Sequence, residues 1–335
     1  MNNTSEPYAE PDIISNEAQY MINLWLMAVA TTLAAIPAMI TNYINVIVFI
    51  RQGLKEHVNF TLFYLSISDL LMAVSVLGYS LLYCGKVSLL PSTIEYESFI
   101  GLFVWMRCLF ADLSSALTVF ISTVRCLCVT LPFKFNSSFT LKKTQIIIAI
   151  ITLFVLVDYV PILGTIELVG DVDENGVVIY KLVYSEVNFI MSRINDYLFG
   201  SILAGMCQFC VFVCAVLMLR GLRKSSEVRE NTRKLQSKKD SGKQTAQVLS
   251  TKEKRVVKMV LMMACLYLPA SVPQITASLA RVHVPGLVLG TYTNACDTIV
   301  GVVLFCSTVY ASVNIFIYHT FSTNFRLNFI FRKSK

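Results

Sequence analysis

Residues 59–84 read NFTLFYLSISDLLMAVSVLGYSLLYC, an apolar run that holds one acid, Asp69, and no Lys or Arg. An α-helix rises 1.5 Å per residue, so the run would reach about 39 Å as a helix. That length exceeds the ~30 Å hydrocarbon core of a bilayer. Backbone groups find no water inside a bilayer and must bond within the segment. The stretch therefore predicts a transmembrane helix.

Six similar runs accompany it along the 335 residues. The predicted spans are 21–50, 59–84, 98–131, 143–168, 187–221, 254–281 and 286–319. Only 15% of the chain is charged and 55% is hydrophobic, whereas a soluble domain carries about 25% charge. This composition excludes disordered, collagen-like and disulfide-rich secreted proteins. The predicted fold is an all-α integral membrane bundle of seven transmembrane helices, with a head over 1–20, a membrane domain over 21–319, and an amphipathic helix with a short cytoplasmic tail over 320–335.

The distribution of Lys and Arg predicts the orientation. Residues 1–20 contain four acids and no Lys or Arg, while 23 of the 28 cations fall on the opposite side, in the inner loops and the tail. By the positive-inside rule the head is extracellular and the tail cytoplasmic. The expected location is the plasma membrane, as a multi-pass protein. Asn2 and Asn3 begin overlapping N-x-S/T sequons, which makes them candidates for glycosylation.

Two shorter segments outside the spans have readable patterns. Glu174-Asn175-Gly176 predicts a turn and is followed by an alternating apolar run, so the second outer loop is expected to form a β-hairpin. Phe321, Phe325 and Phe329 recur every four residues beside basic residues. This spacing predicts a short amphipathic helix on the inner membrane surface.

Ionisable side chains inside the predicted spans need an explanation, because each costs at least ~2.5–3.5 kcal/mol to insert. Asp69, Arg107, Asp112 and Asp158 are the clear cases. Two interpretations of these residues are open. Either they hydrogen-bond between helices and stabilise the bundle, or they belong to a functional site.

Five motifs, in order, resemble the rhodopsin-like (class A) G-protein-coupled receptors. They are INVIVFI with NFTLFYLSISDLL, STVRCLCVTLPF at the end of the third span, KEKRVVKMVL followed by a proline in the sixth, and VNIFIYHTFSTNFR in the seventh and beyond. The stretch RCLCVTLPFK, the short tail and a missing loop disulfide are most similar to invertebrate, particularly mollusc, chemosensory-type receptors. An orphan peptide receptor is the next option.

The resemblance implies a polar core and an activation switch. Asn45, Asp69, Ser114 and Asn314 fall on the family's mid-membrane cluster, which commonly holds sodium, although Tyr310 and Ala311 depart from its usual lining. A protonated Asp69 is the alternative. No other metal or cofactor is expected. The switch positions are Arg125, Glu253, Ser271, Pro273 and Tyr318, with an Arg125–Glu253 link expected to restrain the sixth helix.

The predicted ligand pocket consists of Arg107, Cys108, Asp112, Asp158, Gln274 and Asp297. Arg107 lies ~27 Å above Arg125 by helical rise. It occupies the position where amine receptors carry an aspartate, which disfavours an amine ligand. Two readings stay open for Arg107: neutralisation by Asp112 or Asp158, or recognition of a carboxylate or phosphate on a ligand.

Most of the ten cysteines lie within spans or near the reducing cytoplasm, where thiols are expected. Cys84 and Cys296 are different, because both fall at outer helix ends. By helical rise, Cys84 lies ~22 Å above Asp69 and Cys296 lies ~27 Å above Asn314. A disulfide between them and a pair of free thiols are both compatible with the sequence.

The function predicted from the sequence is a receptor that converts the binding of an extracellular ligand, a small anionic molecule or a peptide, into activation of a heterotrimeric G protein. The lipid bilayer is a further partner, and no nucleic-acid partner is expected. A seven-span transporter or channel is the alternative, but such proteins show paired repeats that this chain lacks. The three histidines are scattered and form no catalytic motif, so an enzyme is not expected.

Overall fold

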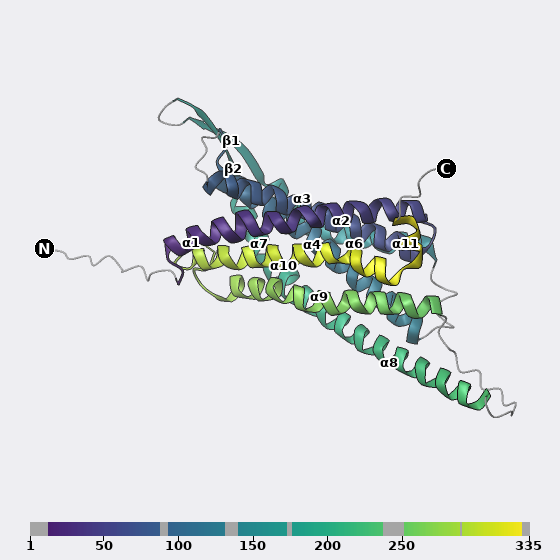
Figure 1. Ribbon diagram of the computed structural model, residues 1–335. Helices are drawn as coiled ribbons and strands as arrows, with labels where there is room; N and C mark the ends of the chain where they lie inside the picture. Colours follow the sequence, from purple (N-terminus) through teal and green to yellow (C-terminus); the bar gives the residue numbers. More distant parts are fainter. Residues whose placement is uncertain are drawn as a thin grey trace, which may run out of the picture.

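The computed structural model describes residues 13–87, 93–130, 140–172, 176–236, 251–288 and 290–329. Within these ranges, seven helical stretches are long and apolar enough to cross a membrane. They pack side by side into one elongated bundle (Figure 1). The predicted seven-helix membrane fold is confirmed.

Two of the seven spans contain a π-helical segment. The first span joins α1 (Asn16–Ile22), η1 (Asn23–Ala30) and α2 (Thr31–Gln52). The fifth joins α7 (Glu186–Tyr197), η2 (Leu198–Leu203) and α8 (Ala204–Gln236). The other spans are α3 (His57–Val87), α4 (Tyr96–Thr130), α6 (Leu141–Gly164), α9 (Thr251–His283) and α10 (Thr293–Phe321), and α11 (Thr323–Phe329) follows the last of them.

Polar residues mark the starts of several helices. The side-chain oxygen of Ser15 accepts from the backbone N–H of Ala18, and that of Ser185 accepts from Asn188. These bonds satisfy N–H groups that lack a partner in the first turn of a helix. The first helix thus begins at Asn16, inside the predicted head, most of which lies outside the described residues.

Several helix ends differ from the predicted spans: the first helix begins five residues earlier, at Asn16, and the fifth continues 15 residues further, to Gln236. The fourth helix ends at Gly164 and the chain continues into a strand at Ile166. The last helix begins at Thr293, seven residues after the predicted start. Gly286 has a φ of 75°, which belongs to a turn and not to a helix. The apolar residues after it therefore form a loop.

The predicted hairpin in the second outer loop is confirmed. Strands β1 (Ile166–Val172) and β2 (Val178–Tyr184) pair antiparallel, with Leu168 opposite Leu182. Gly176, at the turn, has a φ of 78°; residues 173–175 lie outside the described part. The hairpin projects from the bundle end that also carries α1 (Figure 1). We call this the hairpin end and the opposite one the α11 end.

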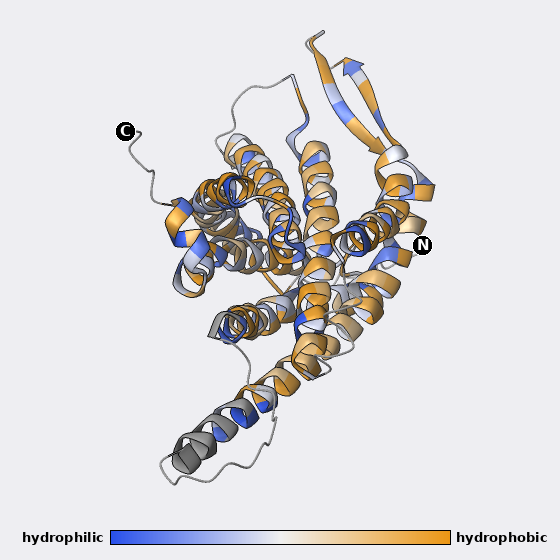
Figure 2. Cartoon of the chain, turned by 90° about the vertical axis from the view of Figure 1, so that its right-hand side faces the viewer, coloured by the Kyte–Doolittle hydropathy of each residue, from blue (hydrophilic) through white to orange (hydrophobic). Residues whose placement is uncertain are grey.

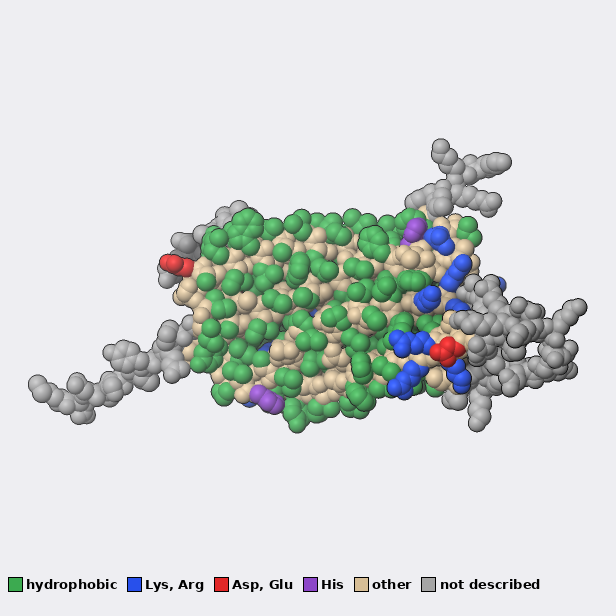
Figure 3. Space-filling model, turned by 60° about the horizontal axis from the view of Figure 1, so that its bottom comes forward, with side chains coloured by type: hydrophobic (Ala, Val, Ile, Leu, Met, Phe, Trp, Pro, Cys, Tyr) green, Lys and Arg blue, Asp and Glu red, His purple; other side chains and the backbone are tan. Residues whose placement is uncertain are grey.

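The kinds of side chain on the bundle surface differ between its sides and its α11 end. Its sides are largely hydrophobic (Figure 2), and Lys and Arg gather at the α11 end on the face shown in Figure 3. This arrangement fits a bilayer around the middle and a basic surface on one side.

The α11 end contains the larger buried core. Phe49, Tyr318 and Phe325 meet there with ring centroids 5.3–5.7 Å apart. Phe325 is completely buried and Leu327 on the same short helix is exposed. The amphipathic helix is therefore present over 323–329, and its Phe325 packs into protein; the rest of the predicted tail, 330–335, is outside the described part.

Candidate functional site

A cavity of about 480 Å³ lies inside the bundle between α3, α4, α6, η2–α8, α9 and α10, and Asp69 of α3 is among its lining residues. Its volume falls within the ~300–1,000 Å³ typical of small-molecule sites. Along α4 the lining runs from Arg107 to Thr123. Arg107, Asp112 and Gln274 of the predicted pocket line it, together with Ser271.

Arg107 is the only Lys or Arg among the described lining residues of this cavity, and it is 3% exposed. It donates from Nη1 to Gln274 Oε1 at 2.9 Å and from Nη2 to Ser307 Oγ at 2.8 Å. Its Nε is buried without a hydrogen-bond partner. The guanidinium is thus held from α9 and α10 by neutral groups.

The two acids considered as partners of Arg107 are bonded elsewhere. The hydroxyl of Tyr159 donates to Asp112 at 2.6 Å, and the amide of Asn195 donates to Asp158. No ion pair joins Arg107 to an acid within 4.0 Å in the part of the chain that the structure describes. Neither acid forms a direct ion pair with Arg107, and Asp112 interacts with it electrostatically at longer range.

Three residues of the predicted pocket do not line the cavity. Asp158 faces α7 through Asn195. Cys108 packs with Trp105 and Leu109 against α6, although its sulfur accepts from Arg107 at 3.8 Å. Asp297 acts electrostatically on Tyr79 and Tyr83 of α3. Helical rotation, which the sequence does not reveal, turns these side chains away from the cavity.

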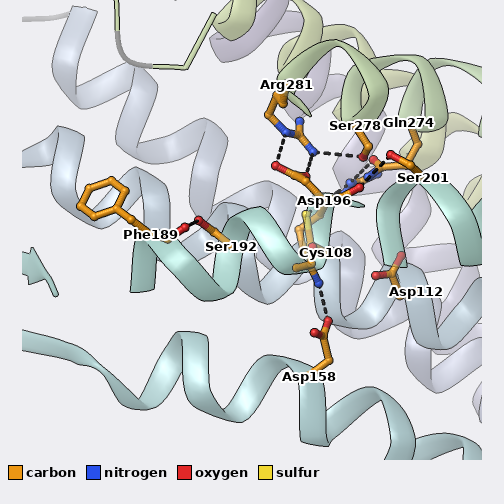
Figure 4. A network of polar contacts seen from close by, with 12 residues as sticks. Cys108, Asp112, Asp158, Phe189, Ser192, Asp196, Ser201, Gln274, Ser278 and Arg281 are labelled. Carbon is orange, nitrogen blue, oxygen red and sulfur yellow. Dashed lines mark hydrogen bonds and ion pairs between the residues drawn. The ribbon is translucent and has the colours of Figure 1, made fainter. Parts of the chain in front are cut away.

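An ion pair that the sequence did not lead us to predict joins α9 to α7 (Figure 4). Arg281 of α9 donates from Nε and Nη2 to the two oxygens of Asp196 on α7, at 2.9 and 2.5 Å. It also donates to Ser278 at 3.2 Å. The sequence did contain a signal for this ion pair. Asp196 lies inside the fifth predicted span, and an acid inside a membrane span needs a partner.

The polar core comes together largely as the resemblance implied. Asp69 accepts from Ser114 Oγ at 2.5 Å and from Asn314 Nδ2 at 2.9 Å, which links α3, α4 and α10. Asn45 bonds instead to Asn42, at 3.3 Å. The side-chain oxygens of Asn45 and Asn314 are buried without partners.

The middle of α9 contains two prolines, Pro269 and Pro273. Proline removes a backbone donor and leaves a carbonyl to be satisfied by other groups. Near this point Ser271 Oγ and Gln208 Nε2 of α8 both donate to the carbonyl of Leu268, at 3.1 and 2.9 Å. Ser271 faces the cavity, so the cavity reaches the interrupted part of the helix.

A second cavity of about 480 Å³ opens at the α11 end. Arg125, Glu253 and Tyr318 line it, from α4, α9 and α10. No Arg125–Glu253 ion pair within 4.0 Å occurs among the described residues, so the expected direct link is not formed in this conformation. The nearby end of α9 is instead bonded to α11, where Arg255 donates to Thr323 Oγ1 at 2.8 Å.

The predicted disulfide alternative is not what the structure shows. Cys84 and Cys296 are both free thiols. Cys84 points toward the carbonyl of Ala28, at 3.9 Å, whereas Cys296 lies near Arg281. The two helix ends have similar heights, but the side chains point to different neighbours.

No group of three or more His, Cys, Asp or Glu that could hold a metal ion occurs in the described ranges. Asn2 and Asn3, the predicted glycosylation sites, lie outside those ranges.

Comparison with known proteins identifies a family for this chain. A family model described as serpentine type 7TM GPCR chemoreceptor Srw matches residues 29–330. A search of curated proteins found no match.

Proposed function

Because the chain belongs to the Srw family of serpentine seven-helix G-protein-coupled chemoreceptors, we propose that its ligand binds in the cavity at Arg107 through an anionic group. Family membership makes the protein a multi-pass membrane chemoreceptor that works with a G protein. It does not favour the transporter or channel alternative. The identity of the ligand group and the role of each residue are our proposals.

The buried guanidinium of Arg107 is the observation that supports this assignment. A buried charge without a counter-charge is costly, and a bound anion would remove that cost. The side chain already presents a fork of donors, which suits a carboxylate or phosphate. Its unpartnered Nε offers a further donor to such a group.

We expect Arg107→Gln to lower the potency of an anionic agonist by about 10- to 150-fold, because a hydrogen bond to a charged group contributes roughly 1.5–3 kcal/mol. The agonist comes from a screen of anionic and neutral compounds with a promiscuous G protein. Lys181→Gln, on the exposed hairpin, is the control and should keep parental potency. Equal potency of Arg107→Gln and the parent across the anionic agonists would contradict the assignment.

We propose an extracellular head and a cytoplasmic tail. The support is the concentration of Lys and Arg at the α11 end and the acidic head. A loss of mass on deglycosylation of the parent, absent from an Asn2→Gln, Asn3→Gln variant, would support both this orientation and the sequons. Labelling of a head tag only after permeabilisation of the cell would contradict the orientation.

The rhodopsin-like motifs, and the finer similarity to mollusc chemosensory-type receptors, support a proposal for activation. Movement of α9 about Ser271 and Pro273 would change the cavity at the α11 end, where Arg125, Glu253 and Tyr318 lie. In the resting state we propose that Glu253 approaches Arg125. Receptor chemistry of this kind needs no catalytic group, and we continue to expect that the protein is not an enzyme.

Glu253→Ala should raise ligand-independent nucleotide exchange about two- to fivefold, since an exposed ion pair contributes up to ~1 kcal/mol. Lys258→Ala, on an exposed position of the same helix, serves as the matched control. Basal exchange unchanged in Glu253→Ala would contradict the Arg125–Glu253 restraint.

We also propose that the polar core binds sodium. Hard cations prefer carboxylate, hydroxyl and amide oxygens. Asp69, Ser114, Asn45 and Asn314 would supply them, and the orphaned amide oxygens of the two asparagines support this assignment. The ion would offset the buried charge of Asp69.

A further inference from the structure

The cavity at Arg107 extends along α4. From Arg107 to Thr123 its lining spans 17 residues of that helix, a rise of about 24 Å. A cavity of this length has room for an extended linear chain.

The two parts of the lining differ in chemistry. At one end Arg107 is flanked by Gln274 and Ser307, which both accept its hydrogen bonds. The part between α4, α6 and η2–α8 is mainly apolar, with Val119, Phe154, Phe199 and Leu203 in the lining, although Asp112, Ser115 and Thr123 also line the cavity. A ligand that satisfies both parts combines an anionic head with an apolar chain.

The apolar branch reaches the lipid-facing surface of the bundle. Ile150 and Phe154 of α6 line the cavity, yet they are 60% and 53% exposed on its outside. The Phe154 ring packs against Phe199 of η2 with centroids 5.3 Å apart. These two rings therefore stand where the cavity meets the hydrocarbon region.

On the hairpin side of the cavity, polar and close contacts join α9 to the fifth span. The bidentate Arg281–Asp196 pair joins α9 to α7 (Figure 4), and neither residue belongs to the cavity lining. Just below, a Cβ on Gly200 would lie 2.4 Å from Ser278 Oγ, so η2 and α9 are in close contact.

From these observations we propose that the ligand is an anionic amphiphile with a single linear apolar chain, and that it enters from the bilayer between α6 and η2, past Phe154 and Phe199. The inference rests on the proposed role of Arg107 and adds the ligand class and the route. The head would bind at Arg107, and the chain would occupy the branch between α4 and α6.

The test uses the full chain in lipid nanodiscs and dodecanoate as the probe, with dodecanol and butanoate as matched compounds. Dodecanoate should bind at least tenfold more tightly than dodecanol. It should bind at least 100-fold more tightly than butanoate, because each buried methylene adds roughly fourfold. Phe154→Trp should slow both the association and the dissociation of dodecanoate at least fivefold. Phe154→Leu should speed both.

Leu153→Trp is the control for the route. Leu153 is also exposed to lipid, at 63%, but it faces the groove toward α3 and not the cavity. Its rates should equal those of the parent. Unchanged rates in both Phe154 variants, with binding that still depends on Arg107, would overturn the entry route and leave the proposed function standing.

Two other results would separate the ligand class from the proposed function. If dodecanoate fails to bind while a short anion or a water-soluble peptide activates in an Arg107-dependent way, the amphiphile is wrong and the role of Arg107 stands. If dodecanoate binds equally well to the parent and to Arg107→Gln, the role of Arg107 itself is wrong.

Discussion

Replacing Asp196 with Ala is expected to destabilise the folded receptor by about 3 kcal/mol or more, because it leaves the Arg281 guanidinium without its counter-charge. The side chains of the pair are only 20% and 13% exposed, and they meet through two hydrogen bonds. Thermal inactivation in detergent and the amount of receptor at the cell surface measure the effect. Arg281→Ala should behave alike.

The double change Asp196→Leu with Arg281→Met should recover most of the lost stability, because two apolar side chains leave no buried charge. The exposed pair on the hairpin is the matched control. There Lys181 donates to Asp171 at 2.8 Å, and this hydrogen bond and the lysine charge lower the pKa of Asp171. Removing that pair should have little effect, since water screens it. Single variants of Asp196 and Arg281 that match the parent in stability would contradict the structural importance of this ion pair.

Asp69→Ala is the second change with a large expected effect. It leaves the hydroxyl of Ser114 and the amide of Asn314 as buried donors without an acceptor. Each such donor costs about 1–3 kcal/mol, so the total loss of stability is roughly 2–6 kcal/mol. Asp69→Asn retains one acceptor oxygen and should fall between this variant and the parent.

The same variants test sodium. Because a ligand that binds only the folded state stabilises it, sodium chloride should raise the inactivation temperature of the parent above that in choline chloride at equal ionic strength. The difference should vanish in Asp69→Ala. Equal temperatures of the parent in the two salts would remove sodium from the polar core and leave the hydrogen bonds of Asp69 unaffected.

The sequence predicted the fold well because a bilayer imposes few choices on it. The length of an apolar run predicts a membrane span. The turn at Gly176 and the alternating apolar run after it predicted the hairpin. The start of the last helix was predicted too early, because a count of apolar residues does not register the turn at Gly286. The π-helical segments η1 and η2 likewise had no readable signature in the apolar pattern.

The site was predictable only in part. Arg107, Asp112 and Gln274 line the cavity as expected, since height along a helix follows from residue number. Which way each side chain points depends on how the helices rotate against one another. For that reason Asp158, Cys108 and Asp297 were misplaced, and the Asp196–Arg281 pair was missed. Helix rotation also explains why Asn45 bonds to Asn42 and not to Asp69 as predicted.

The most direct test of the account is nucleotide exchange on a purified heterotrimeric G protein by the receptor in nanodiscs, with an anionic agonist and its neutral analogue. We predict that the anion accelerates exchange by the parent, that the analogue does so weakly, and that Arg107→Gln shifts the anion's concentration dependence at least tenfold. Two results would contradict these predictions. In the first, no agonist raises nucleotide exchange by the parent above the rate with empty nanodiscs. In the second, the anion's concentration dependence is the same in Arg107→Gln as in the parent.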